Sequence, residues 1–279
     1  MQKKQKIKVA LVYDFDGTLS PGNMQEFGFI QAIGKKPADF WKRSSELSKG
    51  QDASEILCYM KLMIEEARAN QVQLKRESFQ EFGSKIDLYK GVTEWFSLIN
   101  KYGKDRGIEI LHYINSSGLI EMIEGSPIFK EFKKVFACSF LYDVNGVADW
   151  PAVAVDYTAK TQFLFKINKG VHSISDNKKV NEYRQESERP IPFARMIYFG
   201  DGATDIPCMK LVKQFGGNSI AVYKPQSKKK ADMEKLLKEE RVNFVCPADY
   251  TEKGRIYKVV TTILNKIKAD YDLSALESI

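Results

Sequence analysis

Two aspartates near the start of the chain, Asp14 and Asp16, have a spacing that favours metal-assisted chemistry. They follow the apolar run 9–13, which predicts a central strand buried on both faces of a sheet. Two carboxylates at the end of a buried strand cost free energy unless a cation lies between them, and a metal ion is the simplest such cation. The alternative is a helix N-cap formed by Asp16 or Thr18. That alternative accounts for one acidic residue, but not for two that flank an aromatic residue.

A second acidic motif follows the predicted strand 196–199, in the segment GDGATD that contains Asp201 and Asp205. In open α/β sheets, ligands bind at the carboxyl ends of the strands, so both acidic motifs are expected at the same edge. Carboxylate oxygens are the ligands that Mg²⁺ prefers. Asp205 has an alternative interpretation as the cap of the helix that begins at Ile206.

Two further polar features lie beside predicted strand ends. The strand 108–115 runs into Ser116, Ser117 and Gly118, and Lys160 begins the predicted helix 160–167. Ser116 follows the strand directly and is favoured over Ser117, although either serine is also a candidate cap for the next helix. Among the lysines, 166 and 169 compete with Lys160, but they lie too deep in the helix for a ligand contact.

The elements that must position these residues form an α/β pattern interrupted by helices. Residues 24–33, 37–47, 53–69 and 74–86 predict helices without a convincing strand. From Gly91 onward, strands 108–115, 135–142, 147–155, 196–199, 219–223 and 242–245 alternate with helices 92–102, 119–123, 160–167, 206–215, 229–240 and 254–268. Asn145-Gly146 predicts a hairpin, and the polar stretch 171–193 predicts a surface helix and loop of unassigned role.

This order predicts a Rossmann-like α/β fold, in which a mostly parallel sheet has helices on both faces, plus an all-α unit. We expect an α/β core domain formed by residues 1–20 and 90–279, and a helical domain formed by residues 21–89. The length of 279 residues fits one large domain or one domain with an insert, and the 43% apolar content excludes a disordered chain.

Composition restricts the environment and the partners. The chain has neither a signal-peptide pattern nor an apolar stretch long enough to span a bilayer, so we expect a soluble, cytoplasmic protein without a membrane partner. The four scattered cysteines predict buried thiols. The net charge is +7, and the richest basic run is 224–230. A solvated helix start is favoured there over a nucleic-acid patch, because no aromatic residues interleave the lysines.

The four motifs, in this order and at these strand ends, resemble those of the haloacid dehalogenase superfamily of phosphohydrolases. The resemblance covers the α/β core and points to the phosphoserine-phosphatase-like branch with a helical, C1-type cap. It implies that Mg²⁺ is bound by Asp14, Asp201 and the backbone carbonyl of Asp16. It also implies that Asp14 attacks phosphorus and that Asp16 is the general acid and base. The remaining implied roles are phosphate binding by Ser116, Ser117, Gly118 and Lys160, and support by Thr18 and Asp205.

A helical cap closes on small substrates and supplies specificity for the leaving group. The candidates for this role in the predicted cap are Asn23, Glu26, Phe27 and Arg43, with Trp41 close in sequence. Each of them has the alternative of an ordinary place in the cap core or on its surface. Phosphoserine phosphatases carry a glutamate nine residues after the nucleophile, whereas this chain has Asn23 there, which argues against phosphoserine as the substrate.

These observations predict a magnesium-dependent phosphatase that hydrolyses a small phosphorylated metabolite through an aspartyl-phosphate. A phosphotransferase or phosphomutase of the same superfamily would use the same residues and differs only in what intercepts the phosphoenzyme. A non-catalytic phospho-ligand-binding protein is a further alternative, although such proteins usually lose one of the charged positions. We expect no nucleic-acid partner, and the sequence gives neither the substrate nor the oligomeric state.

Overall fold

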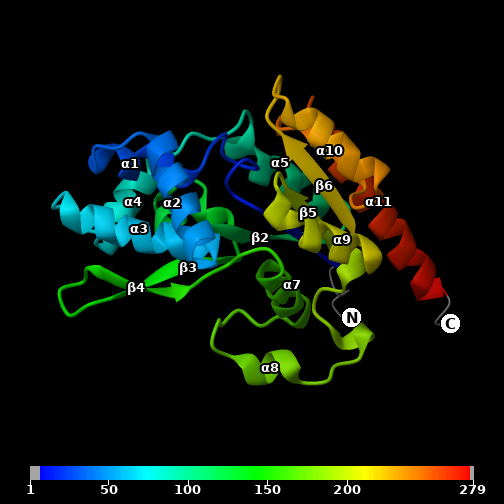
Figure 1. Ribbon diagram of the computed structural model, residues 1–279. Helices are drawn as coiled ribbons and strands as arrows, with labels where there is room; N and C mark the ends of the chain where they lie inside the picture. Colours follow the sequence, from blue (N-terminus) through cyan, green and yellow to red (C-terminus); the bar gives the residue numbers. More distant parts are fainter. Residues whose placement is uncertain (1–6, 277–279) are drawn as a thin grey trace.

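One seven-stranded sheet organises the computed structural model, which describes residues 7–276 (Figure 1). The strand order is β4-β3-β2-β1-β5-β6-β7, and every neighbouring pair is parallel except the β3–β4 hairpin. The strands are β1 Ile7–Tyr13, β2 Ile108–Leu119, β3 Lys134–Tyr142, β4 Ala148–Val153, β5 Met196–Gly200, β6 Asn218–Tyr223 and β7 Phe244–Pro247. The predicted mostly parallel α/β fold and its Asn-Gly hairpin are confirmed.

Strand β1 is the central strand that the apolar run predicted. Its residues from Val9 to Tyr13 are wholly buried, and it pairs with β2 on one side and β5 on the other. The carboxyl end of β1 therefore lies between the carboxyl ends of two neighbours. This arrangement brings the residues that follow β1, β2 and β5 to one edge of the sheet.

Helices cover both faces of the sheet. The pair α5 (Val92–Lys104) and α11 (Arg255–Leu276) packs on β2 and β7, whereas α7 (Ala159–Lys169) and α9 (Ile206–Gln214) pack on β2, β5 and β6. Right-handed crossovers place these two pairs on opposite faces. The remaining elements of the α/β part are α6 Ile120–Gly125, α8 Asn177–Asn181, α10 Lys229–Lys238 and the short 3₁₀ turns at 129–131, 186–188, 193–195 and 203–205.

All named elements between Ser20 and Tyr89 are helical: a 3₁₀ turn at 24–27, α1 Phe29–Ala32, α2 Pro37–Gln51, α3 Glu55–Ala69 and α4 Arg76–Gly83. They lie beside the β3–β4 hairpin (Figure 1). The backbone N–H of Ala148 donates to the Leu74 carbonyl at 2.8 Å, and the Phe79 and Phe140 rings stack 5.6 Å apart. The domain boundaries at residues 20 and 90 stay a proposal, and residues 1–6 and 277–279 lie outside the described residues.

Two local expectations were wrong. The predicted helix 24–33 is two short pieces that meet at Gly28, where a Cβ would lie only 2.9 Å from the Phe82 ring. The helix is interrupted at Gly28, where the backbone lies close to α4. Strand β2 continues past the predicted end at Asn115 to Leu119, with irregular pairing between these two residues, so the Ser116-Ser117-Gly118 segment belongs to the strand.

Other expectations were correct. The stretch 171–193 is a surface helix with loops, and the four cysteines, Cys58, Cys138, Cys208 and Cys246, are buried free thiols. None of the helices within residues 7–276 has the length and apolar character needed to cross a bilayer.

A buried histidine links three elements of the core. His112 on β2 is 3% exposed, with Nδ1 3.0 Å from the Tyr13 hydroxyl and Nε2 3.0 Å from Oδ1 of Asn100. Trp95 Nε1–H donates to the Tyr13 hydroxyl, which is therefore left to donate to Nδ1, and Nε2–H then donates to Asn100. Burial lowers the pKa of His112 to about 3, so the imidazole is neutral in the folded protein.

Acid should therefore destabilise the protein through His112. Between pH 6.5 and 3 the unfolded chain binds a proton that the folded chain does not. The free energy of unfolding then falls as the pH falls, by up to about 1.4 kcal/mol per pH unit from this group. We expect His112→Gln to lower stability at pH 7 but to flatten this dependence in urea unfolding at pH 7, 6 and 5. The half-buried His172 provides the control, because His172→Gln should keep most of the slope. Equal slopes in wild type and His112→Gln would contradict the assignment.

Candidate active site

Three aspartates converge at the carboxyl edge of the sheet. Asp14 follows β1, Asp201 follows β5, and Asp205 lies four residues further on, at the start of α9. One carboxylate oxygen of each lies within 4.8 Å of the others, and all three side chains are buried. The Asp14 N–H donates to the Phe199 carbonyl at 2.8 Å, so the parallel pairing of β1 with β5 fixes this convergence.

Lys160 supplies the positive charge of the cluster. It projects from α7, is 0% exposed, and places Nζ 2.7 Å from Oδ1 of Asp205 and 3.1 Å from Oδ1 of Asp14. Burial alone lowers the pKa of Lys160, but Asp14 and Asp205 outweigh it and raise the pKa, so the ammonium stays charged. The competing lysines face elsewhere: Lys166 and Lys169 donate to backbone carbonyls of the stretch 171–193.

Both carboxylate oxygens of Asp205 accept hydrogen bonds from neighbouring groups. Its Oδ1 accepts from Lys160 and from the Tyr198 hydroxyl at 2.8 Å, while its Oδ2 accepts the backbone N–H groups of Asp201 and Gly202 at 3.2 Å. Its side chain makes no capping bond to α9, so the helix-cap alternative does not describe it. With both oxygens engaged, Asp205 orients Lys160 and the loop that carries Asp201.

Asp14, Asp16 and Asp201 all have raised pKa values, although Lys160 lies beside Asp14 and Lys229 beside Asp201. Burial, followed by the charge of Asp205, raises the pKa of Asp14 to about 7, against the opposing effect of Lys160. Burial and the nearby Asp14 raise the pKa of Asp16 well above its usual range, and burial also raises the pKa of Asp201. An additional cation would stabilise the ionised forms.

The donors of the site fit a hard divalent cation. They are all oxygens, and Oδ1 of Asp14 is buried and accepts no hydrogen bond, having only the ion-pair contact with Lys160. Gly17 lets the backbone approach Asp201 closely: a Cβ there would lie 2.0 Å from Oδ2 of Asp201. Mg²⁺ is bound in proteins by one or two carboxylates with several retained waters, which matches Asp14 and Asp201.

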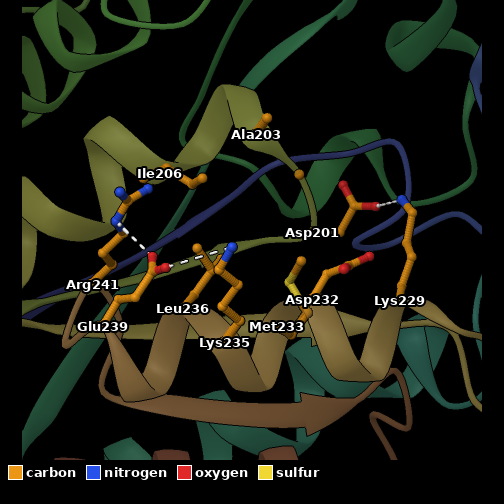
Figure 2. Close-up of a pocket in the computed structure, with 11 residues that line it drawn as sticks. Asp201, Ala203, Ile206, Lys229, Asp232, Met233, Lys235, Leu236, Glu239 and Arg241 are labelled. Carbon is orange, nitrogen blue, oxygen red and sulfur yellow. Dashed lines mark hydrogen bonds and ion pairs between the residues drawn. The ribbon is translucent and has the colours of Figure 1, made fainter.

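Lys229 also lies near this site, although the sequence analysis interpreted the basic run 224–230 as a solvated helix start. Figure 2 shows it reaching from α10 to Asp201, where Nζ lies 2.6 Å from Oδ2. The pocket drawn there, about 450 Å³, lies on the α10 side of Asp201. Its rim charges largely pair with one another, as Glu239 does with Arg241 at 3.1 Å and with Lys235 at 3.9 Å. The order of the elements could have indicated this position for Lys229, because α10 follows β6 and β6 lies next to β5 in the sheet.

A cleft of about 200 Å³ opens over the aspartates. The α/β part contributes Asp14, Asp16, Ser116, Ser117, Gly118, Asp201 and Thr204. The helical segment, which comprises the elements between Ser20 and Tyr89, contributes Asn23, Gln25, Trp41, Ile56 and Tyr59. Both candidate serines line it. Ser116 Oγ accepts the Gly118 N–H at 3.0 Å, whereas Ser117 Oγ is buried and has no partner, so the choice between them stays a prediction.

Only some of the predicted specificity residues line the cleft. Asn23 lines the cleft, and Glu26 lies behind it, where Oε1 accepts from Asn23 Nδ2 at 2.9 Å and Trp41 Nε1 at 2.8 Å. Phe27 does not line the cleft, and Arg43 instead pairs with Glu66 on α3. Thr18 is wholly buried outside the cleft, and its carbonyl accepts the Tyr250 hydroxyl at 2.8 Å. Sequence reasoning missed Gln25, because it placed that residue in a continuous helix.

We expect Gly17→Ala to destabilise the protein through Asp201. Gly17 and Gly146 both have φ of +73°, but a Cβ at Gly146 meets nothing within 4 Å. Both alanine variants bear the cost of the left-handed conformation, about 1–2 kcal/mol. Only Gly17→Ala also displaces the Asp201 carboxylate, so it should lose more free energy of unfolding in urea titrations. Equal losses for the two variants would show that the close approach has no energetic weight.

Removing the buried cation should be costly. Lys160→Met leaves Asp14 and Asp205 without their partner, and we expect a loss of about 3–5 kcal/mol in the free energy of unfolding. Adding Asp205→Asn should recover part of that loss. Lys210→Met, at an exposed position on α9, is the matched control and should change little. If Lys160→Met behaved like the control, the ion pair would not support the fold.

The sequence is similar to those of known proteins. A sequence profile of haloacid dehalogenase-like hydrolases matches residues 11–210, which include both acidic motifs, Ser116 and Lys160. An uncharacterised protein of Borreliella burgdorferi is 30% identical over 284 residues, covering 92% of this chain and 96% of the relative.

The fold is also found in solved structures. A substrate-bound phosphoserine phosphatase complex matches with a TM-score of 0.56 and 18% identity, over 92% of this chain and 99% of the phosphatase. A HAD family hydrolase from Salmonella enterica serovar Typhi matches with a TM-score of 0.54 and 14% identity, over 88% of this chain and 69% of the hydrolase. These identities are low and bear on the fold alone. The profile match spans most of the chain, and the chain therefore belongs to the haloacid dehalogenase-like hydrolase family.

Proposed function

We propose that the protein is a magnesium-dependent phosphatase that hydrolyses a small phosphomonoester through an aspartyl-phosphate on Asp14. The observation that carries this proposal is the arrangement of Asp14 and Asp16 beside Asp201 around one cleft, with Lys160 in contact with Asp14. A carboxylate nucleophile, a second carboxyl group beside it and a charged lysine are the groups that phosphoryl transfer through a covalent intermediate requires.

Asp14 and Asp201 would hold Mg²⁺ with their side chains, and Asp16 with its backbone carbonyl. When bound, the ion neutralises the phosphate charge that would otherwise repel an anionic nucleophile. The neighbouring Lys160 ammonium, 3.1 Å from Asp14, holds the carboxylate of Asp14 in place and favours its ionised form.

The first step forms a bond between an Asp14 oxygen and phosphorus and breaks the bond from phosphorus to the leaving oxygen. Asp16 donates a proton to that oxygen, and burial, which raises the pKa of Asp16, favours the protonated carboxyl group that this step requires. The Met24 N–H donates to Oδ1 of Asp16 at 3.0 Å, and Oδ2 faces Gly118. The acid therefore points at the segment that holds the phosphate.

The second step returns the enzyme to its starting state. Asp16, now ionised, takes a proton from water as the water attacks phosphorus, and the bond from Asp14 to phosphorus breaks. Ser116 or Ser117, with the N–H groups of the same segment and Lys160, would hold the non-bridging oxygens on which negative charge accumulates. Tyr59 fixes this segment by donating to the Ser117 carbonyl at 2.7 Å.

Substitution of either aspartate should abolish turnover. With p-nitrophenyl phosphate and Mg²⁺, we expect Asp14→Asn and Asp16→Asn each to lower kcat by at least about 10²-fold. Asp143→Asn, in the exposed hairpin, should leave kcat unchanged. Chelation with EDTA should remove activity and added Mg²⁺ should restore it. Activity that survives Asp14→Asn or EDTA would contradict the proposal, and a phosphorylated acceptor in place of inorganic phosphate would indicate a phosphotransferase.

A further inference from the structure

The wall of the cleft that faces the leaving group contains no charged side chain. Among residues 7–276, the helical segment lines the cleft with Asn23, Gln25, Trp41, Ile56 and Tyr59. Glu26, a carboxylate of the helical segment that does not line the cleft, accepts hydrogen bonds from Asn23 and Trp41, as described above. A leaving group with a carboxylate or an ammonium would therefore enter the cleft without a counter-charge from this wall, at a cost in desolvation.

Gln25 is the most unusual member of this wall. Its side chain is 2% exposed, it lines the cleft, and its Oε1 has no hydrogen-bond partner. Leaving a buried amide oxygen unpaired costs about 1–3 kcal/mol. A bound molecule that brings a hydroxyl donor within hydrogen-bond distance of this oxygen would remove the cost, and a purely apolar molecule would not.

The two aromatic residues complete the wall with ring surface. Trp41 and Tyr59 meet edge to face, with centroids 5.9 Å apart. Their polar ends are engaged, Trp41 Nε1 with Glu26 and the Tyr59 hydroxyl with the Ser117 carbonyl. The rings therefore offer apolar surface to a ligand. Asn23 is held through Nδ2, which leaves its Oδ1 as a second amide acceptor.

We propose, on the basis of the function proposed above, that the natural substrate is the phosphomonoester of a small uncharged polyol or sugar, and that Gln25 is a specificity-determining residue. The carbon chain of this substrate packs against Trp41, Tyr59 and Ile56, and the hydroxyl groups of the substrate donate to Gln25 and Asn23. The cleft of about 200 Å³ must also hold the phosphoryl group, which restricts the leaving group to a small one.

The first test compares kcat/KM across esters that differ in leaving-group charge. Glycerol 3-phosphate, ribitol 5-phosphate and glucose 6-phosphate represent the uncharged polyols and sugars. Phosphoserine, phosphoethanolamine and phosphocholine represent charged groups, and p-nitrophenyl phosphate reports the chemistry without hydroxyl groups. We expect the best uncharged polyol or sugar ester to exceed every charged ester by at least tenfold. A charged ester in first place would overturn the inference and leave the phosphatase activity intact.

The second test changes Gln25. Gln25→Leu keeps the size but removes the acceptor, so kcat/KM for the best polyol ester should fall about tenfold relative to p-nitrophenyl phosphate, mainly through KM. Gln25→Glu places a carboxylate in the wall and should shift the preference at least tenfold toward phosphoethanolamine and phosphocholine. Gln51→Leu, at an exposed position of α2, is the control and should leave all ratios unchanged.

The outcomes separate the two proposals. If Gln25→Leu leaves the ratio of polyol ester to p-nitrophenyl phosphate unchanged, the assignment of Gln25 is wrong. If no ester is hydrolysed with Mg²⁺, the proposed function fails instead. Calorimetric binding of the same esters then decides the inference, because a polyol ester must still bind more tightly than the charged esters and lose affinity in Gln25→Leu.

Discussion

The contact of Lys160 with Asp14 and Asp205 is the interaction on which the rest of the site depends. A buried carboxylate after a central strand is costly, and a buried ammonium is equally costly. Each is tolerated because the other is present, with Nζ within 3.1 Å of both aspartates. The same contact joins β1, α7 and the loop after β5, so one charge balance fixes three elements that come from distant parts of the sequence.

Most of the α/β architecture could be predicted from sequence because its signals are local. The apolar run of β1, the alternation of strands and helices, and the Asn145-Gly146 turn need no tertiary information. The candidate site residues could also be predicted from the sequence, because the carboxyl ends of parallel strands lie at the same edge of the sheet. Lys160 could be preferred to Lys166 because only the start of α7 approaches that edge, and the structure places Lys166 against backbone carbonyls instead.

The wall of the cleft was much harder to predict, because it depends on how the helical segment folds on itself. Gly28 interrupts the expected first helix, and its backbone packs on Phe82, which turns Gln25 into the cleft rather than along a helix face. Arg43 is close in sequence to Trp41, yet it faces α3 while Trp41 lines the cleft. The approach of Lys229 to Asp201 needs the order of β5 and β6, which spacing alone does not give.

The position of β1 also has a consequence for how the protein is built during synthesis. β1 is made first, but its partners begin only at Ile108 and Met196, and the ammonium that balances Asp14 belongs to residue 160. A ribosome-bound chain that ends before α7 therefore contains a strand end with uncompensated carboxylates, which disfavours a compact early intermediate around it. Such long sequence separations slow folding in general, and the contacts of Lys160 with Asp14 and Asp205 cannot both form until residue 205 has been synthesised.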